Sequence, residues 1–491
     1  MERNHPMIFL SFEFYLAVIA LLVVYYCFPP RLRWTVLLTA SLGGYIFLAG
    51  EGSILLGMNI AVSFLMGHAL KGLQDRQNGT GIRRLCLGLG VLVVVMPLFL
   101  AKEGTYLAER LLHRDGISFW SALGLAYFTL QTIGYMVDVY RGEILPEKNL
   151  AKYALFVSFF PQIVQGPIAR YGRLSPQFFG EVRFDERKFS KGLQWLLWGF
   201  FLKLMIADRA GVIVNRVFDN WEIYTGGYVL LAGVLYSLQL YADFSACVYL
   251  AKGVAGLFGI QLEDNFRQPY FSRSVKEFWG RWHITLSSWL KDYIYIPLGG
   301  NRKGKLRKWL NLCIVFAVSG MWHGAGLKYV FWGLMHAAYQ IAGELTAPVR
   351  RRIYRVLRIE ENDLPAVVVQ RVMTFFWVML AWIIFRAESL RAGLQMLRNL
   401  FTVYNPWIFW NDSIYTLGLD IKECMMLFLT VLFLFAVSRR QEKMTGTVGE
   451  WLLDQHLLTR WTVYLGAALL IVVFGTYGYG FDAFDFIYGG F

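Results

Sequence analysis

The chain has 491 residues, of which 56% are hydrophobic and only 17% charged. This composition excludes an ordinary water-soluble globule and indicates an integral membrane protein. The net charge of +14 would suggest nucleic acid in a soluble protein. Here the lysines and arginines gather in short stretches between apolar runs, so they predict contact with anionic lipid and the cytosol.

The apolar runs predict an all-α, polytopic fold of roughly 11–13 transmembrane helices, plus re-entrant or interfacial helices around a central funnel. The first run, 8–28, is too long for the core of a signal peptide and is expected to be retained. Basic clusters at 31–33, 71–84 and 141–152 follow alternate runs, which places the N-terminus outside. Because there is no repeat of about 20–50 residues, we expect a single domain over 1–491.

Later spans are predicted near 191–212, 228–258, 309–327, 329–345, 366–385, 424–438 and 461–479. The five cysteines lie far apart and mostly inside apolar runs, so they indicate neither a disulfide framework nor a cysteine metal site.

Two segments depart from this regular pattern. Residues 153–168 are apolar but contain two prolines between basic flanks, which favours a re-entrant hairpin with Gln162 and Gln165 lining a cavity; a plain loop is the alternative.

Residues 277–290 mix aromatic, charged and hydroxyl side chains and are too polar to span the membrane. As one helix, this segment would place Trp282 on one face, and His283 with Ser287 on another. That pattern is typical of an interfacial helix at the mouth of a cavity.

The run 319–325 sets Trp322 and His323 among small residues, in a stretch without a charged residue from 311 to 327. An imidazole at membrane depth loses its water and needs a partner or a chemical purpose. A neutral imidazole can serve as a general base, so we interpret His323 as the reactive centre of a membrane enzyme. The alternative is a histidine that only hydrogen-bonds to a neighbouring helix.

Other polar residues near apolar spans also need partners or water. Asp243 is the best candidate to line a pore, whereas Lys203 and Asp208 are five residues apart and do not face each other on an α-helix. Orientation or oxyanion roles are conceivable for Asn265, Asp292 and Asn301. A metal site built on His283, His323 and His336 is not expected, since no familiar ligand spacing is present.

Several ordered motifs together resemble the membrane-bound O-acyltransferases, in particular a bacterial branch that acts on envelope polymers. The motifs are Phe160-Pro161-Gln162, Tyr241-Ala242-Asp243-Phe244-Ser245, Glu263-Asp264-Asn265-Phe266, Phe278-Trp279-Gly280-Arg281-Trp282-His283, Trp289 to Arg302, Trp322-His323-Gly324-Ala325 and Ile384-Phe385-Arg386. Residues 296–302 are more similar to the polysaccharide O-acetylases than to the teichoic acid D-alanyl transferases. The chain departs from the acetylase pattern at 246–249, where Ala-Cys-Val-Tyr replaces a second carboxylate motif.

The resemblance implies that His323 is the catalytic histidine and His283 the second signature polar position. It implies an acyl donor on the cytosolic side, either acetyl-CoA or an acyl carrier's phosphopantetheine thioester, and no tightly bound cofactor. An extracytoplasmic lipase-like partner and an envelope polysaccharide acceptor are also implied, in the membrane of a bacterial cell.

The basic cluster before the run that carries His323 could dock the donor's phosphates or could simply anchor the protein on the cytosolic side. Its members are Arg302, Lys303, Lys305, Arg307 and Lys308. Intramembrane charges also occur in transporters, and a structural scaffold is a further alternative, but the two histidine-bearing aromatic segments favour an enzyme.

Overall fold

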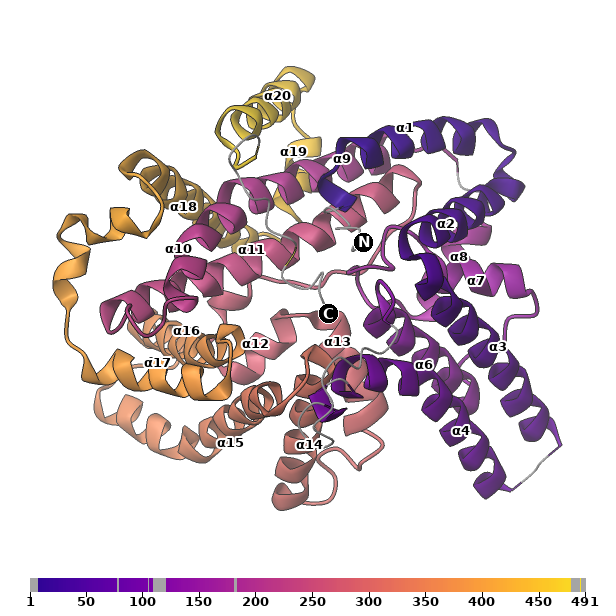
Figure 1. Ribbon diagram of the computed structural model, residues 1–491, viewed down its shortest axis with the longest axis horizontal. Helices are drawn as coiled ribbons and strands as arrows, with labels where there is room; N and C mark the ends of the chain where they lie inside the picture. The colour runs from indigo at the N-terminus through magenta and orange to yellow at the C-terminus, as the bar shows by residue number, and fades with distance from the viewer. Residues whose placement is uncertain are drawn as a thin grey trace. The chain divides into compact units, whose positions relative to one another are not determined.

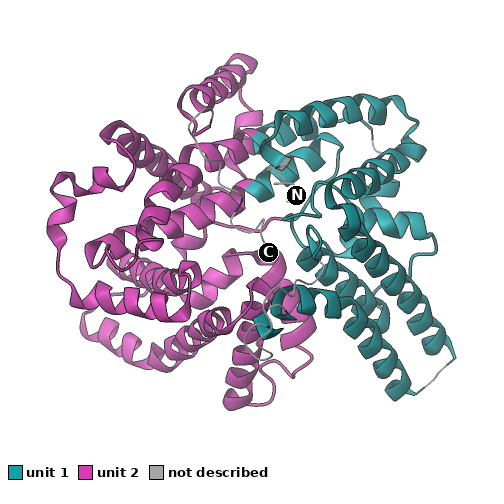
Figure 2. Ribbon diagram, in the orientation of Figure 1, with its two compact units in different colours: residues 1–196, 247–263, 488–491 teal, residues 197–246, 264–487 magenta. Residues whose placement is uncertain are grey.

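The computed structural model describes residues 8–76, 79–104, 106–108, 121–180, 183–477 and 486. Apart from one isolated β-bridge, all regular secondary structure in these residues is helical (Figure 1). The predicted all-α class is confirmed. The chain divides into two compact units (Figure 2). Two of the boundaries fall inside helices α9 (Glu186–Phe200) and α11 (Gly227–Leu257), and another lies in the loop between Glu263 and Asp264.

Unit 1 comprises residues 1–196, 247–263 and 488–491. In order, its helices are η1 (Ile8–Leu10), α1 (Phe12–Cys27), η2 (Pro30–Leu32), α2 (Arg33–Ala49), η3 (Gly50–Gly52), α3 (Ser53–Asp75), α4 (Thr80–Phe99), the π-helix η4 (Leu100–Gly104), α6 (Leu125–Arg141), α7 (Leu150–Ser158), α8 (Tyr171–Phe179) and the first part of α9. The segment predicted to be re-entrant is broken as expected, because α7 ends at Ser158 and turns follow.

Unit 2 comprises residues 197–246 and 264–487 and carries both signature histidines. In order, its elements are the end of α9, the π-helix η5 (Phe201–Ala207), α10 (Asp208–Phe218), the first part of α11, η6 (Pro269–Phe271), α12 (Val275–Arg281), α13 (Ile284–Leu290), the π-helix η7 (Lys291–Tyr295), α14 (Lys305–His323), α15 (Leu327–Val356), α16 (Leu364–Arg386), α17 (Leu390–Thr402), η8 (Pro406–Phe409), η9 (Asp412–Leu417), α18 (Ile421–Lys443), α19 (Val448–Leu453) and α20 (Leu457–Phe474).

Six helical segments of the described chain are long and apolar enough to cross a membrane: 30–75, 80–104, 227–257, 364–386, 421–443 and 457–474. Their burial differs greatly. The apolar window of α11 is 72% buried, whereas that of α20 is only 6% buried. Exposed leucines and valines on an apolar helix fit lipid and not water, so this is a polytopic membrane protein. Helices α14 and α15 are not among the six; each bears basic residues near one end.

Candidate active site

His323 is the last residue of α14, and it is positioned by very close packing of α14 against α15. The two helices form an antiparallel hairpin in which a methyl group on Gly320 would lie 2.2 Å from the Tyr329 carbonyl oxygen, and one on Gly333 would lie 2.1 Å from the Phe316 carbonyl oxygen. Only glycine permits such an approach of two backbones. The small residues around His323 therefore allow the close contact between α14 and α15, and that contact positions the histidine.

The His323 side chain is buried, with 2% of its surface exposed, and aromatic rings surround it. The ring centroids of Trp322, Trp332 and Phe385 lie 4.9, 5.1 and 5.5 Å from its imidazole, each close to perpendicular to it. These rings come from α14, α15 and α16. The histidine at the centre of the sequence prediction thus lies in an apolar, aromatic environment, which favours the neutral imidazole of a general base.

His283 lies between two short helices and not within one. The prediction of a single helix over 277–290 is wrong, because Trp282 pairs with Phe266 in an isolated antiparallel β-bridge and His283 adopts a left-handed conformation with φ of +43°. Histidine tolerates this region better than most residues. The break separates α12 from α13, so the face that Trp282 was expected to form on one continuous helix does not exist.

Asn265 fixes the chain next to His283. Its side-chain Oδ1 accepts hydrogen bonds from the backbone N–H and the hydroxyl of Thr285, and its carbonyl oxygen accepts one from the Ile284 N–H. These bonds satisfy donors at the start of α13 that a capping side chain would otherwise serve. The orientation role anticipated for Asn265 is therefore consistent with its contacts.

The His283 imidazole is fully buried, and neither ring nitrogen has a hydrogen-bond partner among the described residues. Its ring centroid lies 4.8 Å from that of Phe244 and 5.9 Å from that of Trp322. Burial lowers the pKa of His283 to about 3, because desolvation penalises the imidazolium. His283 is thus neutral at ordinary pH and is available to exchange a hydrogen bond with a ligand.

The two signature histidines flank one indole, since Trp322 contacts both rings. The structure therefore brings together three residues that the sequence singled out: His283, Trp322 and His323. Trp282 packs in the adjoining aromatic cluster against Phe278 and Trp382.

His336 is a residue that the sequence argument dismissed and the structure places beside the site. It is fully buried in α15, and its ring lies 5.1 Å from that of Trp332, which also contacts His323. Both of its nitrogens lack a hydrogen-bond partner within the described ranges. The motif Trp332-Gly333-x-x-His336 on a helix was the available signal, because residues four apart share a helix face.

The remaining predicted residues lie in several environments. Ser287 is half-buried and donates to the Trp282 carbonyl oxygen, Asp292 is half-buried in η7, and Asn301 is exposed in the turn before α14. Gln162 and Gln165 are buried in unit 1, where Gln162 Nε2 donates to the Phe156 carbonyl oxygen. Among the basic candidates, Arg302, Lys303, Lys305 and Arg307 are exposed, and Lys308 is half-buried and paired with Glu344.

Asp243 belongs to a buried ionic triad. Its Oδ1 lies 2.8 Å from Lys203 Nζ, and Asp208 Oδ1 lies 2.9 Å from the same nitrogen. Lys203 and Asp208 were not expected to pair, because side chains five residues apart do not face each other on an α-helix. The π-helix η5 brings residues five apart onto one face, so the two side chains meet.

No group of three or more potential metal ligands is found in the part of the chain that the structure describes. Comparison with known proteins then decides the family. The sequence model described as MBOAT, membrane-bound O-acyltransferase family, matches residues 144–385. A probable alginate O-acetylase, AlgI, of Pseudomonas putida is 31% identical over 466 residues, which are 92% of each chain. The chain belongs to the membrane-bound O-acyltransferase family.

Two further relatives of this acyltransferase act on other envelope polymers. A peptidoglycan O-acetyltransferase of Helicobacter pylori is 33% identical over 402 residues, covering 76% of this chain and 73% of the relative. A teichoic acid D-alanyltransferase of Bacillus subtilis is 28% identical over 267 residues, covering 50% of this chain and 65% of the relative. The match to the family, predicted from the motifs, is confirmed, and the protein is an acyltransferase.

Proposed function

We propose that this acyltransferase moves an acetyl group from a cytosolic thioester toward a hydroxyl group of a cell-envelope polysaccharide, with His323 as general base. The observation that carries the proposal is the arrangement of His323 and His283 on either side of the Trp322 indole, in a buried aromatic setting. Support for acetyl in place of D-alanyl transfer comes from the higher identity and coverage of the O-acetylating relatives.

The chemistry needs one proton acceptor. His323 takes the proton from the hydroxyl group of the immediate acceptor as that oxygen attacks the thioester carbonyl, so that the new C–O ester bond forms and the C–S bond breaks. The proton then passes from the imidazolium to the departing thiolate, so the histidine ends in its starting state. General-base assistance of this kind is worth about 100 to 10,000-fold in rate. His283, neutral and fully buried, supplies a hydrogen bond to the reacting groups.

The donor is a co-substrate, acetyl-CoA or an acyl carrier's phosphopantetheine thioester, and its phosphates dock on the basic cluster at 302–308. Lys305, Arg307 and Lys308 occupy the first turn of α14, where positive charge opposes the helix dipole. A bound phosphate would relieve that repulsion and use the free N–H groups at the helix start. We further infer a bacterial inner-membrane location with the N-terminus outside, and an extracytoplasmic lipase-like partner that completes transfer to the polysaccharide.

The test is transfer of radiolabelled acetyl groups from acetyl-CoA by purified protein in proteoliposomes, with mass analysis of envelope polysaccharide from cells with and without the protein. His323→Ala should abolish transfer, and the surface variant His68→Ala should leave it intact, since His68 is exposed on α3. Full activity of a folded His323→Ala variant contradicts the assignment. Acetylation that is unchanged in cells without the protein contradicts the proposed acceptor class.

A further inference from the structure

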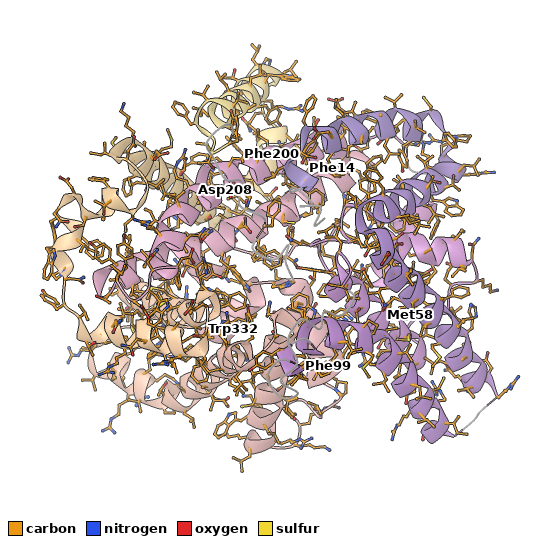
Figure 3. The ribbon with its side chains drawn as sticks, viewed as in Figure 1. Phe14, Met58, Phe99, Phe200, Asp208 and Trp332 are labelled. Carbon is orange, nitrogen blue, oxygen red and sulfur yellow. The ribbon has the colours of Figure 1, made fainter. Side chains whose placement is uncertain are left out.

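Imidazole and indole rings alternate through the centre of unit 2. The order is His283, Trp322, His323, Trp332 and His336, with successive ring centroids 5.9, 4.9, 5.1 and 5.1 Å apart. His323 is at the middle of this array, between two indoles. Trp332, labelled in Figure 3, lies on α15 and is shared by His323 and His336.

A general base in this position becomes a buried cation when it accepts a proton. An imidazolium transferred from water to an apolar interior is strongly disfavoured unless something offsets its charge. Two charged groups on the packed helices α15 and α16 do not supply a negative charge: Lys328 donates to the Ala387 carbonyl oxygen, and Arg386 binds Asp219. Both are cations, and Tyr329, His283 and His336 are neutral neighbours.

Two features of the site do favour a cation at His323. As the last residue of α14, it lies at the negative end of that helix dipole. The indoles of Trp322 and Trp332 are nearly perpendicular to the imidazole, with ring centroids 4.9 and 5.1 Å from it. These distances are inside the ~6 Å range over which an indole attracts a cation that lies over its face, and tryptophan is the strongest of the aromatic residues in this respect.

The Trp332 indole also carries an energetic cost that packing alone does not explain. It is fully buried, and its Nε1–H has no hydrogen-bond partner in the described residues. An unsatisfied buried donor is destabilising, and a phenylalanine would pack there without one. The ring is nevertheless held firmly, stacked on Trp382 at 5.6 Å and edge-on to Phe385 at 5.0 Å.

We propose that Trp332 is a positioning residue that stabilises the protonated form of His323 during acyl transfer. The inference rests on the proposed role of His323 as base. In this proposal the Trp332 indole has a chemical role, and the neighbouring rings of Trp382 and Phe385 hold it in place.

The experiment measures kcat/KM against pH for acetyl transfer from acetyl-CoA by the full-length protein with Trp332, Trp332→Phe and Trp332→Leu. Loss of the indole makes His323 harder to protonate, so the acid-side midpoint of the profile should move to lower pH by about one unit in Trp332→Leu. The plateau should fall about tenfold for the same reason. Trp332→Phe should lie between wild type and Trp332→Leu in both respects.

A role limited to packing would lower the plateau without moving the midpoint. Trp289→Leu, which removes another buried indole of unit 2, is the matched control and should leave the midpoint in place. An unmoved midpoint in Trp332→Phe, or one that moves to higher pH, overturns the inference while the proposed function stands. Retained transfer in His323→Ala overturns both.

Discussion

Substitution of Gly333 by alanine tests whether the α14–α15 contact positions His323, the proposed general base. The new methyl carbon would lie 2.1 Å from the Phe316 carbonyl oxygen and 2.9 Å from its carbon. Both are backbone atoms, which cannot rotate away, so the helices must separate by roughly 1 Å, at an overpacking cost of ~1–3 kcal/mol. Alanine regains up to ~1 kcal/mol of helix propensity, which leaves a net destabilisation of about 0–2 kcal/mol. Trp332, the preceding residue, moves with the helix.

The matched control is Gly343→Ala, on the same helix, where a methyl group meets no atom within 4 Å. That variant should be neutral or up to ~1 kcal/mol more stable. Thermal unfolding of the detergent-solubilised proteins, followed by tryptophan fluorescence, gives the order of stability, and acetyl transfer gives the effect on the site. The reasoning is refuted if Gly333→Ala unfolds at or above the wild-type temperature and keeps full activity.

Three other variants test further parts of unit 2. His283→Asn should retain the fold, since asparagine also tolerates the left-handed backbone, but should lose most transfer activity; wild-type activity in membranes would contradict a role for the imidazole. Lys203→Met leaves Asp208 and Asp243 without the ammonium group they share and should destabilise the protein by ~3–5 kcal/mol in thermal unfolding; adding asparagine at both aspartates should recover much of that loss, and failure to recover would argue against the ionic explanation. Charge reversal at 302–307 should raise the apparent KM for acetyl-CoA at unchanged membrane insertion, and an unaltered KM would leave the cluster as an anchor only.

The class of fold and the apolar surroundings of His323 were predictable because each depends on local composition. Long apolar runs predict helices in a membrane, and an isolated histidine in such a run is unusual enough to mark a site. The pairing of His323 with His283 was anticipated only through the family resemblance. No local rule brings residues 283 and 323 to the same indole.

The features that sequence reasoning missed depend on departures from the α-helix. Lys203 and Asp208 pair only because η5 is a π-helix. The chain breaks at His283 only because Phe266, far back in the sequence, pairs with Trp282. Both departures are set by tertiary packing, which propensity does not encode.

Two irregular segments of unit 2, η5 and the break before α13, coincide with buried polar groups, and a membrane explains why. Non-helical or π-helical backbone leaves groups that lipid cannot satisfy, so it is tolerated only where protein covers it. In agreement with this, η5 is almost entirely buried, and so are His283 and Asn265 at the break before α13. The exposed helices α18 and α20 are regular and apolar instead. The exposed helices α18 and α20 are thus regular, whereas the π-helix η5 and the break before α13, which orient ionisable side chains, are buried. The π-helix η7 has no buried residue, so on this reasoning it should lie outside the hydrocarbon layer.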